Sequence, residues 1–300
     1  MSALLTTSLV TLLLASAAPR APQWHRDDLP HAQPELAATR IVSFAPVVTE
    51  TLFLLGRGDN VVGVTRFCDR PPQAAARDKV GGFVDISLER VVALKPDLVI
   101  AMPSLGQRAL LDRLRGLGIP VLVVFADGFA EVKLMTSGLG DVVRARPAAD
   151  ALNAELDLAM AALRGKMLTP RRAAVVVGHA PLVVAGPGTF AAEALSIAGL
   201  SSAVPPDAPL WPVWSAESLA LSGVQVLVAA EGAQAAAALR ALIDRVVPAG
   251  RRPHVVAAAE PILMRPGPAL VADLAALGAL LAALEDPPHS KRAVVAGEPP

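Results

Sequence analysis

The chain has 300 residues, and its 27 lysines and arginines balance its 27 aspartates and glutamates, so the formal net charge is zero. This balance argues against a nucleic-acid partner, which leaves a basic footprint on a sequence. The length suits two domains at about 150 residues each, and the single cysteine, Cys68, excludes an intrachain disulfide.

Residues 1–18 predict a signal peptide. An apolar run from Leu4 ends in an Ala-Ser-Ala sequence at residues 15–17, which is typical of an export signal and too short to span a bilayer. The alternative is a buried or disordered N-terminal tail, because no lysine or arginine precedes the apolar run. We expect an exported protein in which residues 19–38 form a disordered lead-in.

Residues 39–146 predict an α/β lobe in which strands and helices alternate. The predicted strands cover 40–44, 61–64, 98–101 and 121–125, and the predicted helices cover 48–55, 87–94, 106–116 and 129–143. Alternation at this spacing indicates a parallel sheet with crossover helices. Gly56 stands where a helix ends in a left-handed glycine.

Residues 147–167 predict one long connecting helix. Pro147 suits a first helical turn, and no other proline or glycine interrupts the segment before Gly165. At 1.5 Å per residue, this helix is about 30 Å long, which is the width of a small domain.

The α/β pattern restarts over residues 168–285, which predict a second lobe. The predicted strands cover 173–177, 224–229 and 254–258, and the predicted helices cover 190–198, 217–221, 232–246 and 268–284. Residues 286–300 predict a disordered tail.

Two stretches of the first half recur in the second half. Glu50–Gly56 corresponds to Glu193–Gly199, and Ser87–Ala101 corresponds to Ser215–Ala229, with the same spacing and order. The repeat predicts two similar Rossmann-like lobes with parallel sheets, joined by the single long α-helix. A ligand cleft is expected between the lobes, outside the carboxyl ends of the strands.

The motifs of common enzyme classes are absent from the sequence. No G-x-G-x-x-G follows a predicted strand, and the Walker A and G-x-S-x-G patterns are missing. We interpret Cys68 as an inert buried thiol. His179 follows a predicted strand and is interpreted as a cleft-lining side chain, since a zinc site needs three or four converging ligands. The sequence therefore predicts no catalytic residue and no metal site.

One glutamate in each lobe follows a serine that can cap a helix. Glu89 and Glu217 each occupy the second helical position after such a serine. One interpretation is that they stabilise the helix dipole, an effect of about 0.3–1 kcal/mol at a surface. The other is that they form a matched pair of carboxylates, one on each lobe, for arginine pockets of a symmetric partner.

Several longer segments resemble a known family. The segments are Arg40-Ile-Val-Ser-Phe-Ala-Pro46, Val61-Val-Gly-Val-Thr-Arg-Phe67-Cys-Asp69, Val80-Gly-Gly-Phe83, Ser87-Leu-Glu89 through Pro96-Asp97, Trp211-Pro212-x-x-Ser215-x-Glu217 and Glu260-Pro261-x-Leu263-x-Arg265-Pro266-Gly267-Pro268. They resemble the periplasmic substrate-binding proteins of cobalamin and iron–siderophore ABC importers, a group with a helical backbone. The similarity covers about residues 39–285 and is greatest to the cobalamin-binding branch.

This resemblance implies a monomeric periplasmic receptor that delivers a small molecule to a dimeric permease, with no resident cofactor. It places Glu89 and Glu217 at the permease-docking positions, and so favours docking over helix stabilisation. It also assigns six residues to the ligand cleft. These residues are Phe67, Phe83, Met102, Val177, Trp211 and Arg265.

The cleft residues depart from the family pattern. The family often has tyrosine or tryptophan at the positions of Phe67, Phe83 and Met102, and an aromatic residue at that of Val177. The predicted cleft therefore offers fewer stacking and orienting groups. Cobalamin or a related corrinoid is the expected ligand. The alternatives are a ferric siderophore or haem-type chelate, which a strongly positive cleft would favour, and a two-lobed metal-dependent enzyme.

Overall fold

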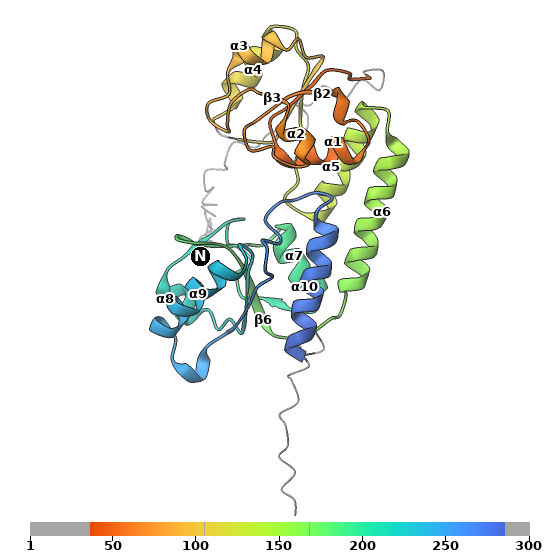
Figure 1. Cartoon of the computed structure of the whole chain (residues 1–300). Coiled ribbons are helices and arrows are strands. Elements are labelled where there is room, and N and C mark those ends of the chain that lie inside the picture. The colour runs from red at the N-terminus through yellow and green to blue at the C-terminus, as the bar shows by residue number, and fades with distance from the viewer. Residues whose placement is uncertain (1–36, 105, 168, 286–300) are drawn as a thin grey trace, which may run out of the picture.

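The computed structural model describes residues 37–104, 106–167 and 169–285. These residues form two α/β lobes, each built on its own sheet, and a bundle of helices runs along one side of both (Figure 1). This arrangement confirms the predicted α/β class with two lobes. The predicted signal peptide, most of the predicted lead-in and the whole predicted tail lie outside the described residues. Within the described part of the chain, no helix is long and apolar enough to cross a membrane.

The N-lobe, defined as β1 to α5, contains a five-stranded sheet. Its elements are β1 (Ile41–Ser43), α1 (Pro46–Leu54), η2 (Gly58–Asn60), β2 (Val61–Val64), α2 (Pro72–Ala75), β3 (Asp78–Lys79), α3 (Leu88–Ala93), β4 (Leu98–Ala101), α4 (Arg108–Gly116), β5 (Val121–Val123) and α5 (Phe129–Val142). The strand order is β3-β2-β1-β4-β5, and every pairing is parallel, as the alternation of elements predicted. The ordered chain begins before residue 39, since Ala38 is buried and its N–H donates to the Val142 carbonyl.

The connecting helix is α6 (Arg146–Leu163), which packs against both α5 and α10. It begins at Arg146, one residue before the predicted start, with Pro147 in its first turn, and it ends four residues before the predicted end at residue 167. The reason is Gly165, which adopts a left-handed φ of 65° and donates its N–H to the Ile197 carbonyl. The chain is thereby turned toward α7. Eighteen residues give a helix about 27 Å long.

The C-lobe, defined as β6 to α10, contains a six-stranded sheet. Its elements are β6 (Arg172–His179), β7 (Leu182–Val184), α7 (Phe190–Ile197), β8 (Ser201–Ser202), β9 (Val213–Trp214), α8 (Ala216–Leu221), β10 (Val226–Ala229), α9 (Ala233–Val246), η3 (Ala249–Arg251), β11 (His254–Val256) and α10 (Leu270–Glu285). The path is β11-β10-β6-β7-β9, with β8 paired to β6.

The C-lobe sheet is mixed, whereas the sequence predicted a parallel sheet. Strands β8, β10 and β11 follow the parallel pattern. Strand β7 pairs antiparallel with both β6 and β9. The correction has a simple cause, because a two-residue turn at Ala180-Pro181 returns the chain directly alongside β6. The three residues of β7 are too few to show a strand period in the sequence.

One apolar cluster extends through both lobes and the helical bundle. Leu139 of α5, Leu156 and Leu163 of α6, and Leu277 of α10 are all buried within it. Burying a leucine side chain contributes roughly 1.5–3 kcal/mol. The two lobes therefore share a common core along the helices, which fixes α6 as part of a packed layer and not as a free linker.

Candidate functional site

A pocket of about 510 Å³ lies at the carboxyl ends of the N-lobe strands. Because these strands are parallel, the loops after β1, β2 and β4 meet at one edge of the sheet. The lining residues come mainly from those loops, and a short C-lobe segment completes the wall. They are Phe44, Ala45, Pro46, Val47, Arg66, Phe67, Asp69, Phe83, Met102, Pro103, Ser104, Gln107, Met264, Arg265 and Pro266.

The apolar wall of this pocket is a pair of stacked rings. Phe67 and Phe83 lie with ring centroids 4.7 Å apart and planes inclined by 13°. Both side chains still expose 44% and 43% of their surface. Such stacking contributes about 0.5–1.5 kcal/mol beyond burial. The pair therefore forms an ordered apolar platform on which a flat ligand can lie, and Met102 lines the same pocket.

Arg265 crosses from the C-lobe to two carboxylates of the N-lobe. Its Nη1 lies 2.9 Å from Glu50 Oε1 and 3.2 Å from Asp69 Oδ1. Burial alone would lower the pKa of Arg265, but hydrogen bonds to Glu50 and Asp69 outweigh burial and raise it. Burial likewise opposes ionisation of Asp69, yet its hydrogen bond to Arg265 leaves the pKa of Asp69 below its usual value.

The second cation of the pocket, Arg66, is also paired. Its guanidinium forms an ion pair with Asp85, whose other oxygen accepts a hydrogen bond from the Gly82 N–H at 2.9 Å. The hydrogen bond from Arg66 lowers the pKa of Asp85. Both arginines that line the pocket are thus matched by carboxylates, and the pocket is not strongly positive.

Gln107 lines the pocket and was not singled out in the sequence. It is only 3% exposed, and its Nε2 donates a 3.0 Å hydrogen bond to the Phe83 carbonyl. Its Oε1 is buried without a hydrogen-bond partner among the described residues. The only feature of the sequence that could have indicated a role for this residue is its position, because it is a polar residue at the start of α4, just after the loop that follows β4.

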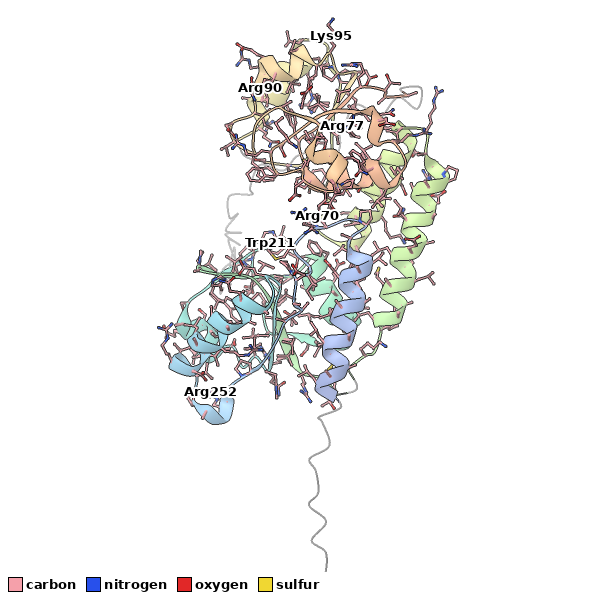
Figure 2. All side chains as sticks on the ribbon, viewed as in Figure 1. Arg70, Arg77, Arg90, Lys95, Trp211 and Arg252 are labelled. Atoms are coloured by element: carbon pink, nitrogen blue, oxygen red, sulfur yellow. The ribbon has the colours of Figure 1, made fainter. Side chains whose placement is uncertain are left out.

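The pocket brings together four of the six predicted ligand residues: Phe67, Phe83, Met102 and Arg265. Val177 and Trp211 do not line it. Val177 is part-buried on β6, where it packs against the shared core. Trp211 precedes β9 and lies on the face of the C-lobe that looks toward the N-lobe (Figure 2).

The carboxyl ends of two C-lobe strands carry a histidine–glutamate pair. His179 ends β6, and its Nδ1 lies 2.7 Å from the Oε2 of Glu231, just after β10. Among the described residues no three histidine, cysteine, aspartate or glutamate side chains cluster in a way that could hold a metal ion. Cys68 is fully buried, with its Sγ 3.1 Å from the Thr65 hydroxyl.

The two glutamates predicted for docking have matching surroundings. Glu89 lies in the first turn of α3, where the Ser87 hydroxyl accepts the Arg90 N–H at 3.3 Å. Glu217 lies in the first turn of α8, and the Ser215 hydroxyl caps that helix in the same way. Both glutamates are exposed. Figure 1 shows α3 and α8 on different lobes, both away from α6.

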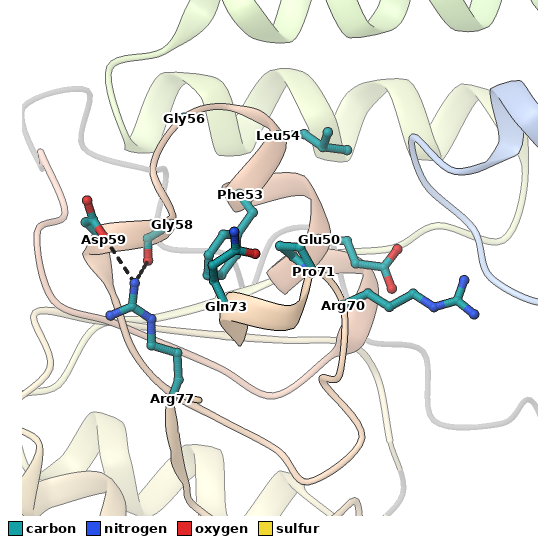
Figure 3. A pocket seen from close by; sticks show the side chains of 10 residues that line it. All are labelled: Glu50, Phe53, Leu54, Gly56, Gly58, Asp59, Arg70, Pro71, Gln73 and Arg77. Carbon is teal, nitrogen blue, oxygen red and sulfur yellow. Dashed lines mark hydrogen bonds and ion pairs between the residues drawn. The ribbon is translucent and has the colours of Figure 1, made fainter. Parts of the chain in front are cut away.

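A second pocket, of about 550 Å³, lies on the N-lobe beside α1 and α2 (Figure 3). Arg77 occupies one end, with bonds to the Gly58 carbonyl and Asp59 and its guanidinium 5.8 Å from the Phe53 ring centroid. Arg70 lies near the other end (Figure 3). The Arg77 contacts join parts of the N-lobe to each other, so we assign no ligand to this pocket.

Two lobes, a shared helical layer and an apolar pocket between them define the chain as a two-lobed ligand-binding protein. Residues 41–244 match the sequence profile of the periplasmic binding protein family. The chain belongs to this family, which confirms the family predicted from the sequence.

Named relatives of this chain are binding proteins. The vitamin B12-binding protein of Yersinia pestis (strain Pestoides F) is 28% identical over 204 residues, which cover 65% of this chain and 70% of the relative. The structure of the periplasmic vitamin B12-binding protein of Vibrio cholerae superposes with a TM-score of 0.70 at 23% identity, covering 83% of this chain and 99% of that one.

A haem-binding protein is similar in structure as well. The periplasmic haem-binding protein of Pseudomonas aeruginosa gives a TM-score of 0.65 at 27% identity, over 82% of this chain and 93% of that one. The fold is therefore shared by proteins that bind different chelates, and the ligand of this chain must be argued from its own pocket.

Proposed function

We propose that this protein is the periplasmic solute-binding component of an ABC importer and that its ligand is cobalamin or a related corrinoid. The observation that carries the proposal is the stacked Phe67–Phe83 platform beside arginines whose charges are already matched. A flat, bulky and largely uncharged macrocycle suits such a wall. Similarity to vitamin B12-binding proteins supports the same ligand.

The charge of the pocket argues against an anionic chelate. Arg66 and Arg265 are outnumbered by the three carboxylates that they contact, Glu50, Asp69 and Asp85. A carboxylate-rich siderophore or haem would have to displace these ion pairs before it could use either arginine. A corrinoid with a neutral rim can bind without displacing these ion pairs.

Apart from two methionines, the pocket lacks the usual protein ligands of haem iron. The chain contains no tyrosine, and no histidine or cysteine is among the residues that line the pocket. The axial ligands of haem are commonly histidine, cysteine, tyrosine or methionine, which leaves only Met102 and Met264. Cobalamin brings its own axial base and needs no protein ligand.

Equilibrium titration of the purified protein with cyanocobalamin tests the proposal, with hemin and a ferric hydroxamate titrated in parallel. We expect cyanocobalamin to bind most tightly. Phe67→Ala should weaken its binding by about 10–30-fold, since aromatic anchors carry much of the energy of a binding site. Leu54→Ala, at an exposed apolar side chain outside the pocket, serves as the control. Absence of cyanocobalamin binding at tens of micromolar would rule the proposal out.

The partner and location follow from the same proposal. We assign Glu89 and Glu217 to docking on a dimeric permease, one contact per lobe, and residues 1–18 to a signal peptide that directs the protein to the periplasm. Their exposure and matching serine caps support the docking role. A monomer is the expected state, since each lobe supplies one contact to a two-fold partner.

A further inference from the structure

One polar atom of the ligand pocket is left unused by the fold. The Oε1 of Gln107 is buried and has no hydrogen-bond partner among the described residues, although the side chain is 97% removed from solvent. Buried acceptors in folded proteins are nearly always paired, and each exception calls for an explanation. The residue lines the pocket beside Phe83 and Ser104.

The hydrogen bonding fixes which end of the Gln107 amide is unpaired. Its nitrogen donates to the Phe83 carbonyl at 3.0 Å. Rotating the amide by 180° would place two carbonyl oxygens face to face, because a glutamine oxygen can only accept. The unpaired atom of the amide is therefore its oxygen, which is a hydrogen-bond acceptor.

Helix capping does not account for this oxygen. Gln107 occupies the N-cap position of α4 (Arg108–Gly116), where a side-chain oxygen ordinarily accepts a backbone N–H of the first turn. Gln107 makes no such bond. Among the described residues, neither the helix nor a neighbouring side chain uses this acceptor, and Gln107 lines the pocket.

We infer that Gln107 Oε1 accepts a hydrogen bond from a primary amide on the rim of the ligand, and so selects an amide-bearing corrinoid over a carboxylate-bearing one. The inference rests on the proposed function. Amide N–H groups donate, whereas an ionised carboxylate only accepts and would meet the Gln107 oxygen with like partial charge. Pairing of Arg66 and Arg265 with carboxylates leaves little compensation for an anionic rim.

The test compares two corrin rings that differ only in their rim groups. Dicyanocobinamide keeps the ring amides, and dicyanocobyrinic acid carries carboxylates in their place. At pH 7.5 we expect the wild-type protein to bind the amide ring at least about tenfold more tightly, which corresponds to about 1.4 kcal/mol. Gln107→Met preserves the length of the side chain but removes the acceptor. It should lower affinity for the amide ring about tenfold, and it should leave affinity for the acid ring unchanged or raise it, because the repulsion between the Gln107 oxygen and a carboxylate is removed.

Gln73→Met is the matched control, since Gln73 is an exposed glutamine that lines the second pocket and not the ligand pocket. Equal loss of affinity for both rings in Gln107→Met would show that Gln107 acts only through Phe83, and would overturn the inference. Equal affinity of the wild type for both rings would overturn it as well, even if Gln107→Met does not fold. Failure of the wild type to bind either ring would instead overturn the proposed function.

Discussion

The two lobes are built on the same plan but contribute unequally to the pocket. In each lobe the first helix ends at a left-handed glycine, Gly56 or Gly199, and a serine caps the later helix that carries a glutamate. Yet the N-lobe supplies most of the lining, and the C-lobe supplies only residues 264–266. The C-lobe sheet also differs from the N-lobe sheet, because the antiparallel strands β7 and β9 end its path at one edge. A repeated architecture therefore surrounds a pocket whose lining is asymmetric.

Two glutamates at equivalent positions of the repeat each contact the opposite lobe, but through different hydrogen bonds. Glu50 of α1 pairs with Arg265 from the C-lobe at 2.9 Å. Glu193 of α7, its counterpart in the repeat, accepts the backbone N–H of Phe129 in α5 at 2.9 Å. The first bond is an ion pair beside the pocket. The second is a hydrogen bond from the backbone at the start of a helix. The same position in the repeat contacts the opposite lobe in both halves, but only Glu50 contacts a residue that lines the pocket.

The two glutamates proposed for docking should contribute equally to uptake, and this is the largest effect we expect. Replacing both, Glu89→Ala with Glu217→Ala, should reduce ligand uptake through the permease to background while ligand affinity stays unchanged. Each single substitution should lower uptake at least about tenfold and by a similar factor, because losing one partner of an interfacial charge pair costs about 2–5 kcal/mol. Uptake of labelled ligand in cells and titration of purified variants measure the two quantities.

Glu155→Ala, which removes an exposed glutamate of α6, is the control for a general loss of surface charge. A single substitution without effect would show that the lobes do not dock equivalently. A fall in ligand affinity in the double variant would place these carboxylates in the ligand site and refute the docking assignment.

The two helix-ending glycines should differ in their tolerance of a side chain. Gly56 has a φ of 70° with open space around it, so Gly56→Ala should cost about 1 kcal/mol from the left-handed backbone alone. Gly199 has a φ of 97°, and an added Cβ would lie 2.8 Å from the Met167 carbonyl oxygen. Overpacking adds about 1–3 kcal/mol, so Gly199→Ala should cost about 2–4 kcal/mol.

Urea unfolding midpoints, with unchanged slopes, measure these free energies. Gly116→Ala is the control, because Gly116 ends α4 with open space and without a left-handed φ, and alanine there should stabilise the protein slightly. Equal costs at Gly56 and Gly199 would contradict this prediction. They would mean that the segment after α6 moves away from the added methyl group without any cost in stability.

The sequence predicted the repeated architecture well because its signals are local. Helix-capping serines, C-terminal glycines and buried β-branched strands each depend on a few neighbouring residues, and Ser87, Gly56 and β4 were all placed correctly. Strand β7 escaped prediction because three residues show no period. The end of α6 escaped because Gly165 bonds to a distant carbonyl of α7.

The pocket was only partly predictable for a related reason. The resemblance assigned Phe67 and Phe83 to the cleft, but it did not predict that their rings stack on each other. The role of Gln107 could not, because an unpaired buried oxygen is a property of packing and leaves no pattern in the sequence. The pairing of Arg265 with Glu50 joins residues 215 positions apart, and no local signal reports such a contact.

The smallest effect is expected at the junction of the lobes, where Asp127 precedes α5. Its backbone carbonyl accepts the Phe190 N–H of α7, and burial, followed by the nearby Glu131 carboxylate, raises the pKa of its side chain. A raised carboxyl pKa means that the folded state binds the proton more tightly. Ionisation therefore destabilises the fold, and stability falls as pH rises from the unfolded-state pKa through the folded-state pKa.

Asp127→Asn should raise Tm at pH 7 by about 1–3 °C and have no effect at pH 3. Asp207→Asn, at an exposed aspartate of the C-lobe, should change neither value. A lower Tm for Asp127→Asn at pH 7 would show that the ionised carboxylate stabilises the junction, contrary to this expectation.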